Sequence, residues 1–482
     1  MSSSRRQIRY EEYAVHGSTA DDGDVLPPAH SKPTAPPRHS AAASHRANDA
    51  YMDAFDAAHD DLMQRHGQKA VPRMAAEETK IPPSAKQHVV RDLETAAAAA
   101  VSASASEAAG RSPGDLAGAW LQGPRSPDGT VHNVSAQPLL CMSVSRDHRE
   151  IVVGSSDHAL YTIPLSGGSS RGGSRGRTLY SKKFGHAEWV TSAAFLADGR
   201  VLSGGMDSKL CLWDATGVKC EDLVGHSGSV SLVSVVSPEV AVSASYDKTV
   251  RLWNVSRKAT SRQREAGVVK VGAAPILALS AFAASMQAVT GDRDGAVQVV
   301  DLADSKVVRK IPSAHKGHTT SVLASRVDAG AWAFTGGQDG AVKAWDLRQK
   351  AAAPVHVAEV HVDRKSGKAG AVGFLAEPED DSNVLLSAGA DGSVQVLDKR
   401  ASLRALFSFR EHLDFIYALH VQGQLCFSGA GNGMLHVHDW KTGKLLYGLG
   451  ANRAAVRAIA TTPTQLIAAG DDGGVIVYDM NY

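Results

Sequence analysis

The sequence predicts an all-β fold made of repeated units of short strands, a β-propeller, and three observations carry this prediction. A turn Asp or Asn recurs at intervals of 40 to 52 residues along the last two-thirds of the chain. The runs between these turns, such as SLVSVV and VAVSAS, are short, rich in Val and bounded by Gly, Asp and Ser, which is typical of strands. Three of the units also share one frame, in which a His is followed by an Asp 21 residues later and by a Trp six residues after that. Periods of 40 to 50 residues with several strands each favour propeller blades over helical repeats.

The overall composition is that of a globular chain with a large core. The 482 residues are 43% hydrophobic and 21% charged, and the net charge of +1 gives no reason to expect nucleic acid as a partner. Cys141, Cys211, Cys220 and Cys426 lack CxxC spacing, so we expect no metal site and no disulfides, only small apolar side chains. We find no apolar run of 18 residues and no targeting segment, so we expect an intracellular soluble protein that contacts no membrane. The expected compartment is the cytoplasm, with cytoskeletal, ciliary or nuclear association left open.

Residues 1–128 differ from the rest of the chain in being rich in Ala, Ser, Pro and charge, which predicts a largely disordered leader. One or two short helices interrupt it. In the first of them, Met52, Phe55 and Leu62 share one face at helical spacing. Two interpretations stay open, a solvated tail with partial helicity and a docking stripe for a partner or for the chain's own propeller.

From about residue 129 onward the sequence resembles the WD40 repeat family. The resemblance implies four strands per blade and one buried hydrogen-bonded tetrad of His, Ser or Thr, Asp and Trp. The complete sets are His186, Ser203, Asp207 and Trp213; His226, Ser243, Asp247 and Trp253; and His318, Thr335, Asp339 and Trp345. The partial sets are His412, Ser428 and Asn432 with His438; Thr290 and Asp294; and Ser387 and Asp391, while the first and last units lack both the His and the Ser. We interpret all of these residues as structural, because an unpaired buried polar group costs about 1–3 kcal/mol and each member satisfies another.

Eight sets of strands can be counted, and the last one ends without a fourth strand. The family closes its ring with an N-terminal strand, and residues 129–137, GTVHNVSAQ, are in the right place to supply it. We therefore predict one domain over residues 129–482 with eight blades, with seven blades and an irregular unit as the alternative.

The sequence shows no motif that requires catalysis. The segment GSSRGGSRGR lacks the setting of a phosphate-binding loop, and no nucleophile elbow or zinc-protease motif is present. We therefore expect a protein that is not an enzyme and that uses no cofactor and no small-molecule substrate. The resemblance implies that several side chains face the narrow opening of the ring, and exposed aromatic and Arg side chains commonly anchor protein interfaces. These candidates are Trp189, Met206, Tyr246, Arg293, Gln338 and Phe415.

A second candidate surface lies at the ends of the third strands. Two adjacent units end in Asp346-x-Arg348 and Asp398-x-Arg400, which resembles the paired box by which some WD40 proteins dock to the adaptor of cullin-type ubiquitin ligases. The leading hypothesis is a non-enzymatic scaffold that binds other proteins or peptides within a multiprotein complex. The alternative is a ubiquitin-ligase substrate receptor that uses these Arg side chains.

Overall fold

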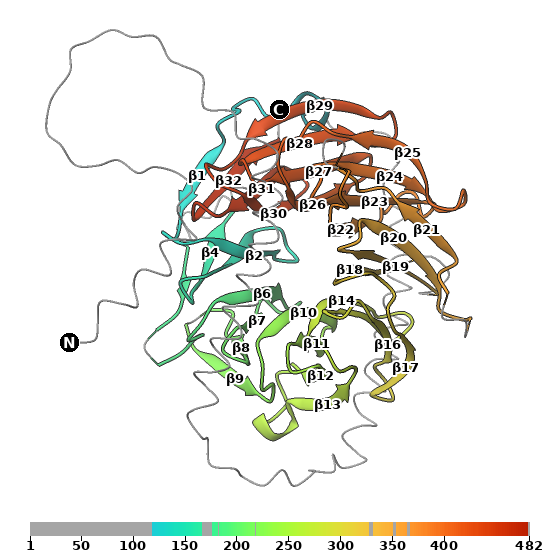
Figure 1. The fold of residues 1–482 in the computed structure, drawn as a ribbon. Helices are drawn as coiled ribbons and strands as arrows, with labels where there is room; N and C mark the ends of the chain where they lie inside the picture. The colour runs from blue at the N-terminus through green and yellow to red at the C-terminus, as the bar shows by residue number, and fades with distance from the viewer. Residues whose placement is uncertain are drawn as a thin grey trace, which may run out of the picture. The chain divides into compact units, whose positions relative to one another are not determined.

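The computed structural model of the chain describes residues 118–165, 176–181, 183–216, 218–326, 331–349, 353–363 and 367–480. Within them, eight four-stranded antiparallel sheets follow one another around a ring (Figure 1). The prediction of an eight-bladed all-β propeller is confirmed. The leader candidates Met52, Phe55 and Leu62 lie outside the described residues.

Each blade contains four strands that follow in chain order from the innermost to the outermost strand, except the eighth. Blades one to four are β2 Leu139–Val144, β3 Glu150–Ser155, β4 Leu160–Pro164 and β5 Thr178–Leu179; β6 Val190–Phe195, β7 Val201–Gly205, β8 Lys209–Trp213 and β9 Cys220–Val224; β10 Val230–Ser237, β11 Val240–Ser245, β12 Thr249–Asn254 and β13 Glu265–Lys270; and β14 Ile276–Phe282, β15 Gln287–Asp292, β16 Val297–Asp301 and β17 Lys306–Ile311. A short 3-10 helix, η1 Ser261–Gln263, precedes β13.

Blades five to eight repeat the same order. They are β18 Thr319–Ala324, β19 Trp332–Gly337, β20 Ala341–Asp346 and β21 His356–Glu359; β22 Val372–Ala376, β23 Val384–Gly389, β24 Val394–Asp398 and β25 Arg404–Phe409; β26 Ile416–Gln422, β27 Leu425–Ala430, β28 Met434–Asp439 and β29 Lys444–Gly450; and β30 Val456–Thr461, β31 Gln465–Gly470 and β32 Gly474–Asp479 with β1 Thr130–Asn133.

The ring closes through its eighth blade. Strand β1 pairs antiparallel with β32, with Thr130 opposite Val477 and Asn133 opposite Gly474. The innermost strand of this blade, β30, packs against β2 of blade one. Closure covers the edge that β32 would otherwise expose, and an exposed edge invites pairing with other chains.

The second strand of each blade is almost wholly buried, because neighbouring blades cover both of its faces. Strands β11, β23, β27 and β31 have six buried residues each and consist mainly of apolar and small side chains, as in VAVSAS and VLLSAG. Hydroxyls near the inner rim connect the blades, since the Ser192 Oγ accepts from the Val233 amide at 3.1 Å and the Ser280 Oγ from the Ala324 amide at 3.0 Å. The ladder between the first and second strands shifts register near its start in all eight blades, as at Val190/Ser192. Such a shift bends and twists a strand.

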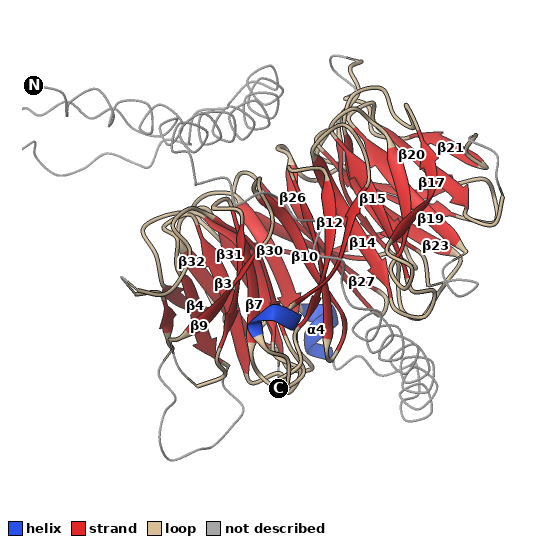
Figure 2. Cartoon of the chain, turned by 90° about the horizontal axis from the view of Figure 1, so that it is seen from below, coloured by secondary structure: helices blue, strands red, loops and turns tan. Residues whose placement is uncertain are grey.

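The packed structure begins earlier in the chain than the boundary at residue 128 that the sequence predicts. Helix α4, Gly118–Gln122, is drawn in blue in Figure 2, and its Trp120 is 3% exposed within the apolar cluster of blades seven and eight. The Trp120 ring meets the Phe427 ring edge-on at 6.0 Å, and the Trp120 carbonyl accepts the Tyr447 hydroxyl at 3.1 Å. We call this contact the Trp120 latch. None of the helices in the described part of the chain has the length and apolarity to cross a bilayer.

Candidate protein-interaction site

Blades two and three each hold a hydrogen-bonded chain of four side chains. In blade two, His186 Nδ1 lies 2.9 Å from Asp207 Oδ1, and His186 Nε2 lies 2.8 Å from Ser203 Oγ. The Trp213 indole N–H donates to the same Ser203 oxygen at 2.9 Å. Blade three repeats these contacts at 2.7–2.9 Å with His226, Ser243, Asp247 and Trp253.

The order of donors in this chain fixes the state of the imidazole. The Asp207 carboxylate can only accept, so His186 Nδ1 carries a hydrogen, and the Ser203 hydroxyl, which accepts the Trp213 indole N–H, can donate its own hydrogen to His186 Nε2. The Nε2 atom is then an acceptor, and the proton of the neutral ring sits on Nδ1 and is donated to Asp207. Each polar atom therefore has a partner inside the blade.

Burial keeps this network in that state. Burial lowers the pKa of His226 by more than the neighbouring Asp247 raises it, so the ring is neutral at neutral pH. Burial alone would raise the pKa of Asp247, but the interactions with His226 and the hydrogen bonds from Thr249 and the Ser227 amide together outweigh it and hold that pKa well below its usual range. A neutral ring facing a fixed carboxylate, with its other nitrogen occupied by a serine, suits a structural role.

Blade five contains a complete tetrad, but its histidine is His315 and not His318. His315 Nδ1 lies 2.9 Å from Asp339 Oδ1 and its Nε2 lies 2.8 Å from Thr335 Oγ1, which also accepts the Trp345 indole N–H at 2.9 Å. His318 points its Nδ1 at the Arg293 carbonyl instead. The assignment of His318 to the tetrad is therefore wrong.

Blade six also contains a histidine that sequence reasoning missed. His361 lies 2.9 Å from Asp391 through Nδ1 and 2.8 Å from Ser387 through Nε2, although it precedes Asp391 by 30 residues. In blade four the carboxylate of the network belongs to Asp292 and not to Asp294. The Gln298 amide bridges Thr290 Oγ1 and Asp292 Oδ2 at 2.8 and 2.7 Å, and so joins a hydroxyl to a carboxylate as the imidazole does in other blades.

The remaining blades hold reduced versions. In blade one Ser135 donates to Asp157 at 2.5 Å, and in blade eight the Asn452 amide donates to Asp472 at 2.8 Å. In blade seven His412 Nε2 lies 2.8 Å from Ser428 Oγ, and the His412 ring stacks on His436 at 4.2 Å. The His438 ring stacks on Phe409 and its Nε2 lies 3.0 Å from Glu411.

The loops that carry these histidines form, with the aspartate turns, one end of the ring. We call this surface the turn face. The six side chains expected on it divide into two groups. Gln338 is exposed and Trp189 and Arg293 are half-buried, whereas Met206, Tyr246 and Phe415 are only 2% to 5% exposed. The expectation that these last three are exposed is wrong, because their side chains are packed into the interior of the ring's end. The Met206 amide donates to the Trp189 carbonyl, and the Gly431 amide to the Phe415 carbonyl, both at 2.9 Å.

The loop between β25 and β26 displays an apolar side chain that sequence reasoning did not single out. Leu413 is 89% exposed, although both His412 before it and Phe415 after it are buried. Phe415 meets Tyr417 edge-on at 6.2 Å, and the Arg457 guanidinium lies 4.3 Å from the centre of the Tyr417 ring. The loop is thus anchored on both sides of an outward-facing leucine.

The paired D-x-R segments of blades five and six are each internally bonded. Arg348 donates to both oxygens of Asp346, at 2.9 and 3.1 Å, and Arg400 Nε donates to Asp398 at 3.3 Å. The side chains of Arg348 and Arg400 are 59% and 70% exposed. Their use by a partner stays a prediction.

The fold and its internal networks define a class of protein, a closed propeller whose blades are each braced by buried polar side chains. Residues 177–214 and 217–254 match the family model described as WD domain, G-beta repeat. The chain is a WD40-repeat β-propeller.

Comparisons with known proteins give relatives of low identity. The chain is 22% identical over 334 residues to the ribosome biogenesis protein YTM1 of Meyerozyma guilliermondii, which covers 61% of this chain and 71% of that protein. The solved structure of Saccharomyces cerevisiae Sqt1 superposes with a TM-score of 0.62 at 13% identity, covering 74% of this chain and 99% of Sqt1. Chaetomium thermophilum Sqt1, bound to the N-terminus of the ribosomal protein L10, gives a TM-score of 0.61 at 16% identity, covering 73% and 99%. These structures share the fold.

Proposed function

We propose that this chain is a non-enzymatic scaffold whose turn face binds a peptide segment of a partner protein. The observation that carries the proposal is the loop of Leu413, which presents an apolar side chain 89% exposed on a backbone that is fixed on both sides. A partner that covers such a side chain gains its burial without having to order the loop first.

The side chains beside Leu413 are of the types that contribute most to binding energy in protein interfaces. Tyr417 and Arg457 lie beside the same loop, and the Arg457 guanidinium is held by both oxygens of Asp471 at 2.7 and 2.8 Å. Arg and Tyr are enriched at the centres of protein interfaces, where fixed side chains lose little freedom on binding. Half-buried Trp189 and Arg293 extend the same face around the ring.

The names of the similar proteins suggest a cellular process and a kind of partner for this proposal. One is named a ribosome biogenesis protein, and one structure of the same fold holds the N-terminus of a ribosomal protein. We therefore propose that the assembly served by this chain is a ribosome-assembly complex and that the bound segment belongs to a ribosomal or assembly protein. The receptor hypothesis based on Arg348 and Arg400 and the cytoskeletal and ciliary associations are not carried into this proposal.

The test compares two exposed apolar positions on different surfaces of the full-length protein. Leu413→Asp places a charge on the turn face, and Val224→Asp places one on the outermost strand of blade two, where Val224 is 74% exposed. Each variant is affinity-purified from cells and its ribosomal and assembly proteins are quantified. We expect Leu413→Asp to reduce their capture at least about tenfold, equivalent to about 1.4 kcal/mol, and Val224→Asp to match the wild type.

Equal capture by both variants would contradict the turn face as the binding surface. If the wild type captures no ribosomal or assembly protein, the proposed role in ribosome assembly is contradicted. An Arg348→Ala/Arg400→Ala variant in the same series tests the receptor hypothesis, since only that hypothesis expects it to lose a ligase adaptor.

A further inference from the structure

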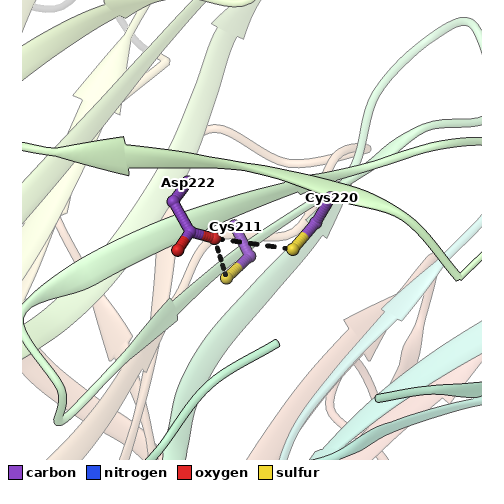
Figure 3. A group of neighbouring side chains, drawn as sticks. All are labelled: Cys211, Cys220 and Asp222. Atoms are coloured by element: carbon purple, nitrogen blue, oxygen red, sulfur yellow. Dashed lines mark hydrogen bonds between the residues drawn. The ribbon is translucent and has the colours of Figure 1, made fainter. Parts of the chain in front are cut away.

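Two of the four cysteines meet at the outer edge of blade two. Strands β8 and β9 pair with Cys211 opposite Asp222 and Trp213 opposite Cys220, so the three side chains of Cys211, Cys220 and Asp222 project from the same face of the sheet (Figure 3). Their ligand atoms all lie within 4.8 Å of one another. The expected packing of the cysteines as small apolar side chains does not account for this pair, because both sulfur atoms contact a carboxylate.

The distances within this group match those of a tetrahedral metal centre. Cys211 Sγ and Cys220 Sγ each lie 3.6 Å from the same oxygen, Asp222 Oδ1. Zinc bonds of about 2.3 Å to sulfur and about 2.0 Å to oxygen, at tetrahedral angles, place a sulfur about 3.5 Å from the oxygen and two sulfurs about 3.8 Å apart. A disulfide fits less well, because its sulfurs must approach to about 2.05 Å and diagonal partners across two strands stand about 7–8 Å apart at their Cα atoms.

The charge balance also suits a divalent cation. Two thiolates and one carboxylate carry three negative charges, and Lys209 Nζ, 2.8 Å from Asp222 Oδ2, supplies one positive charge. A divalent cation would therefore make the group neutral. Because Lys209 pairs with Oδ2, the other oxygen, Oδ1, is the one that faces the two sulfur atoms.

The three side chains differ in their exposure to solvent. Cys211 is buried, Cys220 is half-buried and Asp222 is exposed. An ion can therefore enter past Asp222 and be held by sulfur at depth. Three protein ligands leave one of four positions for water, which is the arrangement of an open zinc site.

We propose that Cys211, Cys220 and Asp222 form a binding site for a thiophilic divalent cation of the zinc class on the rim of blade two. The site lies on the outer strands β8 and β9 of blade two, whereas Leu413 precedes the first strand of blade seven. It adds a function to the propeller that is independent of peptide binding.

The test is a titration of the reduced full-length protein with Co²⁺ as a spectroscopic probe, followed by displacement with Zn²⁺. Thiol alkylation and mass measurement verify beforehand that all four cysteines are reduced. We expect one equivalent of Co²⁺ to bind with a sulfur-to-metal charge-transfer absorption that Zn²⁺ abolishes. Changes to groups next to metal ligands cost about 10–100-fold in affinity, so we expect Cys220→Ser and Asp222→Asn, which change ligands themselves, to cost at least as much.

Two variants control for the loss of a thiol and of an exposed ion pair. Cys141→Ala removes a cysteine of blade one, and Asp304→Asn removes the carboxylate that pairs with Lys306 on blade four. Both should bind Co²⁺ as the wild type does. The proposal is overturned if the reduced wild type gives no charge-transfer absorption, or if Cys220→Ser binds Co²⁺ as tightly as the wild type.

Discussion

His315 and Asp339 are joined by a hydrogen bond of 2.9 Å, 24 residues apart in the sequence, where the repeating frame of blades two and three has 21. The backbone amide of Lys316 donates to the other oxygen of Asp339 at 3.0 Å, as Ala187 does to Asp207. The number of residues between the histidine and the first strand is the same in these three blades. His186, His226 and His315 each stand four residues before β6, β10 and β18, whereas the loop between the first two strands varies in length.

A first prediction concerns the two histidines of blade five. His315→Ala leaves Asp339 and Thr335 without their partner in a buried site, so we expect it to lower the free energy of unfolding by about 1–3 kcal/mol. His318→Ala, the matched control, should cost less than half as much, because its ring lies outside the tetrad. Urea unfolding followed by Trp fluorescence measures both. A larger loss in His318→Ala would contradict the assignment.

A second prediction concerns the Trp120 latch. Truncating a large buried aromatic side chain costs about 3–5 kcal/mol, so Trp120→Ala should lower the thermal midpoint substantially. Leu121→Ala, at a position 36% exposed in the same helix, should change it little. Calorimetry of the full-length protein distinguishes them. Equal midpoints would mean that α4 does not support blades seven and eight.

A third prediction concerns the turn that leads into the closing strand. Gly129 and Gly199 both have a positive φ, so Ala at either position should cost about 1 kcal/mol in backbone strain. At Gly129 the added Cβ also falls 2.8 Å from Ile476 Cγ2 and 2.9 Å from Tyr478 Cδ1, whereas at Gly199 the nearest atom is 3.7 Å away. We therefore expect Gly129→Ala to cost about 1–3 kcal/mol more than Gly199→Ala in urea unfolding. A Gly129→Ala cost no larger than that of Gly199→Ala would indicate that β1 is not packed firmly on blade eight.

A fourth prediction concerns pH. Burial lowers the pKa of His412 to about 3, with the positive charges of His436 and His438 adding to the effect. Burial also lowers the pKa of His420 to about 4, against a smaller opposing effect of Glu379. The unfolded chain then binds more protons than the folded one below the ordinary His pKa of 6.5. Stability is therefore full above pH 6.5 and falls as the pH drops toward these lowered values, by up to about 2 kcal/mol per group at pH 5.

Unfolding in urea at pH 7.5, 6 and 5 tests this dependence. His420→Gln keeps a polar partner for Thr461, which lies 2.7 Å from His420 Nε2, and removes one titrating group. We expect that variant to lose less stability between pH 7.5 and 5 than the wild type. An unchanged slope would show that His420 is not held neutral by its surroundings.

The sequence predicts the propeller well because each blade repeats the same local rules. Strand runs, Gly and Asp turns and the tetrads of blades two and three all follow from spacing within one unit. The errors arose where a loop changed length. A longer connection between β18 and β19 shifted the apparent histidine of blade five, and the segment 362–371 moved His361 away from β22. Counting four residues back from each first strand finds Ser135, His412 and Asn452 as well.

The surface was harder to predict than the interior. Whether Met206 or Phe415 is buried depends on packing in three dimensions, which no local pattern records. The meeting of Cys211 and Cys220 depends on the register between β8 and β9, and their spacing matches no metal-binding motif. The Trp120 latch joins residues 327 positions apart.

The most direct test of the central claim is hydrogen exchange of the indole N–H groups, followed by ¹⁵N NMR of the Trp-labelled protein. If the His, Ser or Thr, Asp and Trp side chains are buried structural networks, the indoles of Trp213, Trp253 and Trp345 should exchange only through opening of the whole blade. The half-buried Trp189 should exchange orders of magnitude faster and serves as the internal reference. Exchange of the three tetrad indoles at the rate of Trp189 would contradict the account.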